Sequence, residues 1–308
     1  MGSGVEIPVI DLAQPRSQRL AELADAYETV GFAYIVGHGV DDAVVSSMFE
    51  AGDRFHGLPM ESKLALARNE NHRGFIALGS STDRASEIEN VTRPNQSESF
   101  MLMRHAAVGD PDLEAGVYLA GPNQWPDIDG FRVAVERYQA AMGSLGQSIV
   151  DLFIEAIGPD EAPARAFDRP TTWLRLLRYP PRPQAVDGVY GSAPHVDFGA
   201  ITLLAQDEVG GLEVQAPSGA WIAVGPKPGA FVLNTGAVMR AWSAGRFRAT
   251  PHRVLNRSDV ARRSVAFFYD PHMNTMIEPL AGTGQDSPSR FADLVRRELD
   301  SGYADPSA

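Results

Sequence analysis

The chain has 308 residues, with 27 Lys and Arg against 39 Asp and Glu, a formal net charge of −12, and no cysteine. The acidic balance argues against nucleic acid as a partner. The lack of cysteine excludes disulfides, zinc fingers, iron–sulfur clusters and thiol nucleophiles, so any metal must be held by His, Asp or Glu.

The composition is that of an ordinary globular protein, with 44% apolar and 21% charged residues. No run of 18 apolar residues and no secretory leader is present, so we expect a cytoplasmic protein without membrane association. We expect a monomer or a homodimer that acts on a small molecule.

The first half of the chain is predicted to be mainly helical. Apolar spacing predicts helices over 16–29, 60–67 and 130–158, and Asp41 or Asp42 can cap another helix that ends near Phe55. Gly31 ends the first helix, and "FAYIVGHGV" (32–40) predicts a strand that runs into a glycine-rich turn. Further strands are predicted at 74–79 and 98–103.

From Thr172 onward, short apolar runs are divided by Gly, Pro, Asn and Asp, a pattern typical of a β-sandwich or barrel. The predicted strands are "WLRLLRY", "HVDF", "AITLLAQ", "LEVQ", "WIAV", "FVLNTG", "HRVLN" and "RSVAFFY". A last helix is predicted at about 288–301. We expect one domain over 1–308, with a largely helical part (1–170), a β core (171–285) and a C-terminal helix (286–308).

His195 and Asp197 stand two residues apart in a predicted strand, so their side chains would share one face. They could form a structural hydrogen-bonded pair or part of a metal site. His252, at the start of another predicted strand, would complete a set of two histidines and one carboxylate. Non-haem Fe(II) oxygenases use this ligand set, and catalytic zinc can be held by the same groups.

Arg262 and Ser264 share a face of the strand that follows His252 in the chain. A guanidinium and a hydroxyl there suit a carboxylate ligand, because arginine binds carboxylates through a bidentate fork. A metal at one end and an arginine at the other fit a short dicarboxylate with a keto group. The alternative is a buried arginine that pairs with an aspartate of the protein.

Several segments resemble the isopenicillin N synthase-like 2-oxoglutarate/Fe(II) dioxygenases over nearly the whole chain. They are "PHVDFGAITLLAQDEVGGLEV", "FVLNTGAVMRAWSAGRFRATPHRVLN", "RRSVAFFYDP", "IPVIDL", "VGFAYIVGHGV" and "RGFIALGS". The resemblance implies an α+β fold: a double-stranded β-helix (jelly roll) core that is buttressed by helices, chiefly from the N-terminal half. It also implies Fe(II), 2-oxoglutarate and O2, with decarboxylation to succinate and CO2 coupled to hydroxylation, desaturation or cyclisation of a small metabolite.

Carried over by position, the resemblance implies that His195, Asp197 and His252 bind iron. It implies that Arg262 and Ser264 hold the distal carboxylate of 2-oxoglutarate, with help from Tyr179. Leu177 and Arg182 stand where many plant members have Asn and Cys, so of that motif only the tyrosine role transfers. Asn234 would line the same pocket or stabilise a turn.

The resemblance also places candidate substrate-binding residues around the mouth of the core. They are Arg73, Phe75, Phe100, Met101, Met103, Phe198, Phe268, Tyr269 and His272. Core packing is the alternative role, above all for Phe268 and the two methionines. The polar candidates Arg73 and His272, and the arginine-rich segment 240–263, favour a substrate that carries a carboxylate.

Three other functions are compatible with parts of this pattern. Isopenicillin N synthase and aminocyclopropanecarboxylate oxidase dispense with 2-oxoglutarate, in which case Arg262 and Ser264 would bind a substrate carboxylate. A non-enzymatic jelly-roll binding protein would be expected to lack a metal ligand. A zinc hydrolase would need a carboxylate base near the metal and no dicarboxylate anchor.

Overall fold

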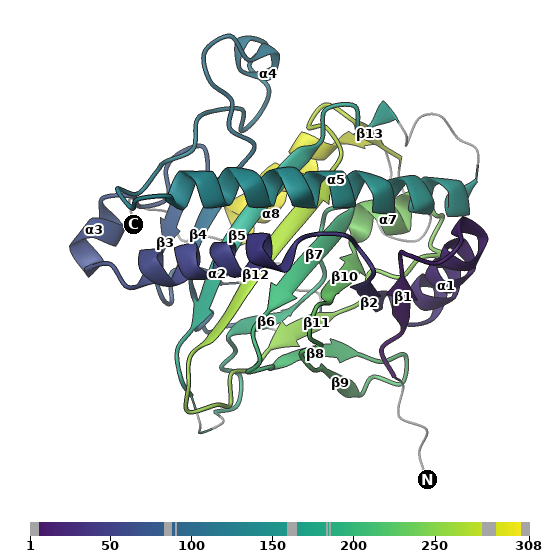
Figure 1. Cartoon of the computed structure of the whole chain (residues 1–308). Coiled ribbons are helices and arrows are strands. Elements are labelled where there is room, and N and C mark those ends of the chain that lie inside the picture. The colour runs from purple at the N-terminus through teal and green to yellow at the C-terminus, as the bar shows by residue number, and fades with distance from the viewer. Residues whose placement is uncertain are drawn as a thin grey trace.

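The computed structural model describes residues 6–82, 88–89, 91–158, 165–182, 184, 186–278 and 288–302. Two facing β-sheets form its centre, and helices cover the outer face of the larger sheet (Figure 1). This is the predicted α+β jelly-roll architecture.

The larger sheet has eight strands in the order β1-β2-β10-β7-β12-β5-β4-β3. Only the β1–β2 pair in it is parallel. The bounds are β1 (Val9–Asp11), β2 (Phe32–Val36), β10 (Phe231–Thr235), β7 (Ile201–Gln206), β12 (Arg262–Asp270), β5 (Thr171–Tyr179), β4 (Glu98–Met103) and β3 (Gly74–Ile76).

The smaller sheet has four antiparallel strands in the order β6-β11-β8-β9. They are β6 (Ser192–His195), β11 (His252–Val254), β8 (Leu212–Gln215) and β9 (Trp221–Val224). A separate two-stranded sheet pairs β13 (Met276–Ile277) with β14 (Ser289–Arg290).

The helices are α1 (Arg16–Thr29), α2 (Asp42–His56), α3 (Met60–Leu64), α4 (Pro111–Glu114), α5 (Phe131–Ile157), α7 (Ala237–Trp242) and α8 (Phe291–Gly302). Figure 1 shows α5 and α2 lying across the outer face of the larger sheet. Length and composition alone would let α5 cross a membrane. Its buried residues Phe131, Tyr138 and Phe153 belong to the core between helices and sheet, which gives the helix a packing role here.

Alternation along the strands divides the apolar side chains into two cores. One lies between the larger sheet and the helices and includes Leu174, Leu176 and Phe267. The other lies between the two sheets and includes Leu177 and Ala266. The face of the larger sheet that meets the smaller sheet is called the inner face below.

The sequence predicted most elements, and the differences have local causes. The third helix ends at Leu64 rather than 67, because the chain from Leu66 to Asn69 turns to hydrogen-bond with Arg73 and Phe75. The strand from Gly74 ends at Ile76, and the last helix begins at Phe291 after the short strand β14. Helices α4 and α7 were not predicted, because four and six residues carry too little periodicity.

The division of the chain at residue 170 does not separate two structural units. Strands β1 to β4 come from the N-terminal part, yet they extend the larger sheet beyond β10 on one side and β5 on the other. The predicted boundary near residue 285 lies outside the described residues.

Candidate active site

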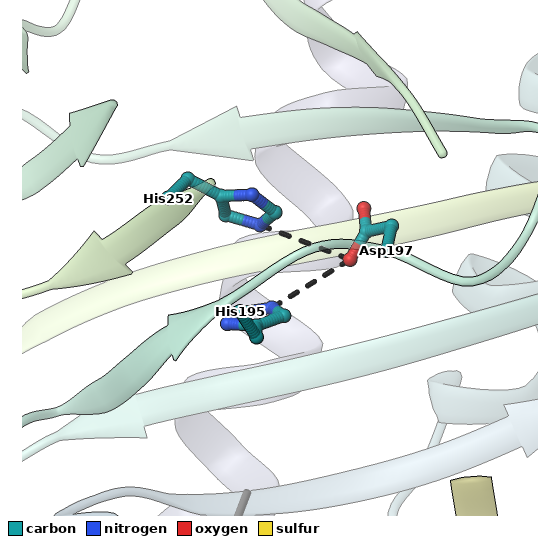
Figure 2. A group of neighbouring side chains, drawn as sticks. All are labelled: His195, Asp197 and His252. Atoms are coloured by element: carbon teal, nitrogen blue, oxygen red, sulfur yellow. Dashed lines mark ion pairs between the residues drawn. The ribbon is translucent and has the colours of Figure 1, made fainter. Parts of the chain in front are cut away.

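Three side chains that are remote in the chain meet between the sheets. His195 ends β6, His252 begins β11, and these two residues are directly opposite each other in the antiparallel register. Asp197 follows two residues after His195. Figure 2 shows the three side chains converging, and one ligand atom from each lies within 4.8 Å of the others.

The prediction that Asp197 lies on the same strand as His195 is wrong. Strand β6 ends at His195, and Asp197 lies in the loop that leads to β7. The loop is held to the start of α7, where the backbone N–H of Ala237 donates to the Asp197 carbonyl at 2.8 Å. The side chains converge even though the strand ends before Asp197.

Both histidines are oriented by their own backbone. Nδ1 of His195 is 2.7 Å from the carbonyl of Ala193, and Nδ1 of His252 is 3.2 Å from the carbonyl of Thr250. A carbonyl only accepts, so Nδ1 donates in each case and Nε2 is the ligand nitrogen of a neutral ring. The two Nε2 atoms lie 3.6 and 3.7 Å from Oδ1 of Asp197.

Hydrogen bonds also orient the Asp197 carboxylate. Its Oδ2 accepts from the Thr202 hydroxyl at 2.6 Å and from the Asn234 amide at 2.7 Å, which turns Oδ1 toward the histidines. Burial opposes ionisation, but the histidines and Thr202 outweigh it and hold the pKa of Asp197 well below its ordinary value. The set therefore provides two imidazoles and one carboxylate, which fits a divalent metal ion.

Thr202 was not predicted to belong to the site, and Asn234 was expected to line the cosubstrate pocket or to stabilise a turn. In the structure the Asn234 amide donates to Asp197, and Asn234 and Thr202 are register neighbours on β10 and β7. The sequence does place a hydroxyl residue at the second position of the strand that follows Asp197. This position could have indicated a role for Thr202 at the site.

The loop that carries Asp197 packs closely against the end of β12. Asp270 is buried and accepts a hydrogen bond from the Ala200 N–H at 2.6 Å. A Cβ on Gly199 would lie 2.1 Å from Oδ1 of Asp270, so only glycine fits at this position. Burial raises the pKa of Asp270 to about 7.

A second candidate binding group lies on the inner face of β12. Arg262 is fully buried, its Nη1 donates to the Ser264 hydroxyl at 3.1 Å, and its Nη2 donates to the Gln206 side chain at 3.3 Å. The guanidinium lies 4.8 Å from the centre of the Tyr179 ring.

Among the described residues, this buried charge lacks an acidic partner that would neutralise it. Within the described part of the chain no carboxylate pairs with Arg262, and its buried Nε has no hydrogen-bond partner. An unpaired buried cation is costly, so the site suits an anionic ligand such as a carboxylate. The alternative of a buried arginine–aspartate pair is not observed there.

Only some of the predicted substrate-binding residues face this space. Met101, Met103 and Phe268 lie on the inner face, where Met101 and Met103 pair across to Arg175 and Trp173 on β5. Phe198 follows Asp197 in the loop, and its ring lies 6.4 Å from that of Trp173.

Three of the aromatic candidates point the other way, and the expectation for them is corrected. Phe75 and Phe100 are buried against Phe55 of α2, with the Phe55 and Phe100 rings 4.2 Å apart. Tyr269 donates to Gln147 of α5 at 2.7 Å. Strand alternation places each of them one residue out of phase with the inner face.

The polar candidates Arg73 and His272 line one small cavity together with Met103. Arg73 is buried and donates to Asn123 and to the carbonyls of Asn71 and Arg104. Burial and the charge of Arg104 lower the pKa of Arg73 to about 10. Nε2 of His272 lies 3.3 Å from Asp112. Both side chains therefore hold the segment around 104–123 in place.

A jelly roll with two histidines and a carboxylate between its sheets defines the class of mononuclear non-haem metal oxygenases. Comparisons with known proteins agree. Residues 7–128 match the family model described as non-haem dioxygenase in morphine synthesis N-terminal, and residues 170–271 match that of the 2OG-Fe(II) oxygenase superfamily.

Relatives match over most of their length. The 2-oxoglutarate-dependent dioxygenase citB of Monascus ruber is 33% identical, covering 92% of this chain and 90% of the relative. A full-length Neurospora crassa protein, crystallised in complex with alpha-KG and thymine, has a TM-score of 0.81 at 25% identity, covering 97% and 98% of the two chains. The rice dioxygenase for auxin oxidation has a TM-score of 0.73 at 29% identity, covering 96% of each chain.

The chain belongs to the 2-oxoglutarate/Fe(II)-dependent dioxygenases. It is an oxidoreductase whose cofactors are Fe(II), 2-oxoglutarate and O2. The cosubstrate-free oxidase and the zinc hydrolase are disfavoured accordingly.

Proposed function

We propose that this dioxygenase oxidises a small organic metabolite, with His195, Asp197 and His252 as the iron ligands and with Arg262 and Ser264 as the anchor of 2-oxoglutarate. The observation that carries the proposal is the buried guanidinium without an acidic partner among the described residues, on the inner face that also meets the histidine–aspartate cluster. Iron, O2 and 2-oxoglutarate together supply the oxidising chemistry when the keto acid is converted to succinate and CO2.

The residues of the chain position these reactants. The Nδ1 hydrogen bonds hold both imidazoles with Nε2 inward, and Thr202 and Asn234 orient Asp197 with one oxygen inward. Arg262 and Ser264 offer donors to the far carboxylate, over the ring of Tyr179. The side chains of His252 and Asp197 are only 11% exposed, which limits the access of water to them.

The names of relatives support a small-molecule substrate. They include a homoarginine-6-hydroxylase of rice, 33% identical over 84% of this chain, and the Neurospora crassa protein in complex with thymine. We further propose that the protein works in the cytoplasm as a monomer or homodimer, without nucleic acid or membrane partners. The net charge of −12 supports the part of this proposal that concerns nucleic acid.

The test is an anaerobic titration of Fe(II)-loaded protein with 2-oxoglutarate, following the weak visible charge-transfer band. Wild-type protein is expected to show the band. Arg262→Gln should need about 10–100 times more 2-oxoglutarate, the loss expected when charge-assisted hydrogen bonds are removed. The metal affinity should be unchanged.

Arg263→Gln is the matched control. Arg263 is the next residue, but its half-exposed side chain points outward to Asp53 and Asp207. It should titrate like the wild type. Equal 2-oxoglutarate affinity in Arg262→Gln and wild type would refute the anchor, and no band in the wild type would refute the proposed function.

A further inference from the structure

Arg175 is a cation on the inner face that no role described so far uses. It lies on β5, opposite Ala266 of β12 on one side and Met101 of β4 on the other. Its strand neighbours on the same face are Trp173 and Leu177, which are both buried. The sequence did not single it out, because an arginine between apolar residues of a strand usually faces water.

The guanidinium of Arg175 is held in place but is not neutralised. Its Nε donates to the hydroxyl of Ser99, a fully buried residue, at 2.9 Å. Its two terminal nitrogens have no hydrogen bond or ion pair with any residue that the structure describes. Arg178, three residues further along β5, points to the other face and pairs with Glu98 at 3.2 Å.

The surroundings of Arg175 are apolar and close to the reaction space. Phe268 and Ser264 of β12 are its diagonal neighbours across the strand pair, at roughly 7–8 Å between Cα atoms. Phe268 is in turn the register partner of Thr202, which hydrogen-bonds Asp197. Arg175 therefore lies on the strand next to β12, which carries the 2-oxoglutarate anchor. Strand β7, whose Thr202 holds Asp197, lies on the other side of β12.

A half-buried cation between apolar side chains is stabilised when an anion binds it. An apolar surface with a single fixed charge selects a ligand that has an apolar body and one opposite charge. Arg262 pairs with Tyr179, which lies four residues beyond Arg175 along β5, so the two arginines would bind two different carboxylates.

We propose that Arg175 binds the carboxylate of the substrate, and that the substrate class is an apolar monocarboxylate. The inference rests on the proposed function, since it assigns 2-oxoglutarate to Arg262 and Ser264. Arg175 is then a residue that determines specificity, while Trp173, Phe268 and Met101 contact the apolar part of the substrate.

The test measures binding to the full chain loaded with Mn(II) and 2-oxoglutarate under nitrogen, by isothermal titration calorimetry. The probes are phenylacetate, 3-phenylpropanoate, cyclohexylacetate and octanoate, each beside its primary amide. For the wild type, at least one carboxylate should bind tenfold or more tightly than its amide. Arg175→Gln should abolish this preference, Arg175→Lys should keep part of it, and Arg178→Gln should retain it in full.

The titration of 2-oxoglutarate itself distinguishes the two proposals and shows that each variant is folded. Failure of the wild type to bind 2-oxoglutarate contradicts the proposed function. If the wild type binds 2-oxoglutarate but prefers no carboxylate over its amide, or if the preference survives in Arg175→Gln, the inference is wrong and the proposed function stands. A loss of 2-oxoglutarate affinity in Arg175→Gln would assign the residue to the cosubstrate anchor and would also overturn the inference.

Discussion

At the scale of single residues, Glu98 and the arginines of the inner face show two different environments of a charged side chain. Glu98 is surrounded by cations of the chain itself: Lys63 at 2.9 Å and His56 and Arg178 at 3.2 Å. Arg262 and Arg175 have no acid beside them among the described residues. A charge that opposite charges of the chain neutralise is structural, whereas an arginine with neither an acid nor a full set of hydrogen bonds among the described residues points to a ligand.

The environment of Glu98 predicts that acid lowers the stability of the protein in a specific pH range. Burial disfavours the Glu98 carboxylate, but hydrogen bonds from His56 and Lys63 outweigh it and lower its pKa to about 2, from an ordinary value of 4.5. Because the folded state binds this proton less readily than the unfolded chain, the stabilisation is complete above about pH 4.5. It is lost as the pH falls toward 2.

Glu98→Gln should therefore lower the free energy of unfolding at pH 7 by roughly 2–3 kcal/mol, and the gap to wild type should shrink by pH 3. Urea unfolding at pH 7, 5 and 3 measures this. Glu136→Gln, which breaks an exposed pair with Arg132, should cost less than about 1 kcal/mol at any pH. A gap for Glu98→Gln that is constant with pH would contradict the assignment.

At the scale of elements, the long helix α5 packs closely against the larger sheet at a glycine. A Cβ on Gly146 would lie 2.8 Å from the ring of Tyr269 on β12. Gly143, one turn earlier in the same helix, would place its Cβ in open space. A glycine-to-alanine substitution at both positions therefore separates the effect of close packing on stability from the effect of helix propensity.

Gly146→Ala should destabilise the protein by about 1–3 kcal/mol, because the tyrosine ring or the helix must move. Gly143→Ala should stabilise it by about 0.5–1 kcal/mol, since alanine favours a helix interior. Thermal unfolding of both variants provides the measurement. Equal shifts of the two midpoints in the same direction would show that α5 does not approach β12 so closely.

At the scale of the whole molecule, the candidate metal ligands connect the two sheets. His195 and His252 belong to the smaller sheet, while Asp197 lies in the connection to β7 and is hydrogen-bonded by Thr202 and Asn234 of the larger sheet. A bound ion would tie both layers together, and only the folded chain brings the three ligands to one point.

Metal should therefore raise the unfolding temperature of the whole protein. At a free Mn(II) concentration of 100 times its dissociation constant, mass action stabilises by about 2.7 kcal/mol. For a chain of this size, that corresponds to several degrees. A chelator should reverse the shift, and His252→Ala should lack it. The control His38→Ala should keep it, because His38 lies in the turn after β2, with Nε2 3.1 Å from the Gly229 carbonyl, and is not part of the cluster. An undiminished shift in His252→Ala would place the metal elsewhere.

The sequence predicted what depends on spacing and left open what depends on register. His195, Asp197 and His252 were found from residue type and position, and α5 from its periodicity. Whether a strand residue faces the site requires knowing which face of the sheet is inner. Phe268 and Tyr269 are adjacent, yet only Phe268 faces inward. Likewise, Arg175 and Arg178 look alike in the sequence. They are distinguished only when β5 is paired with β4 and β12, which places them on opposite faces of the sheet.

The N-terminal strands have a consequence for how this enzyme can be divided. All candidate iron and cosubstrate residues lie beyond residue 170, so that half resembles a minimal catalyst. In the folded chain, β2 covers the edge of β10 and β4 covers the edge of β5. A fragment that starts at β5 would expose two long hydrogen-bonding edges, which invite strand pairing between copies. The first 170 residues thus protect the catalytic half from self-association, and truncation would cause aggregation before it revealed any loss of chemistry.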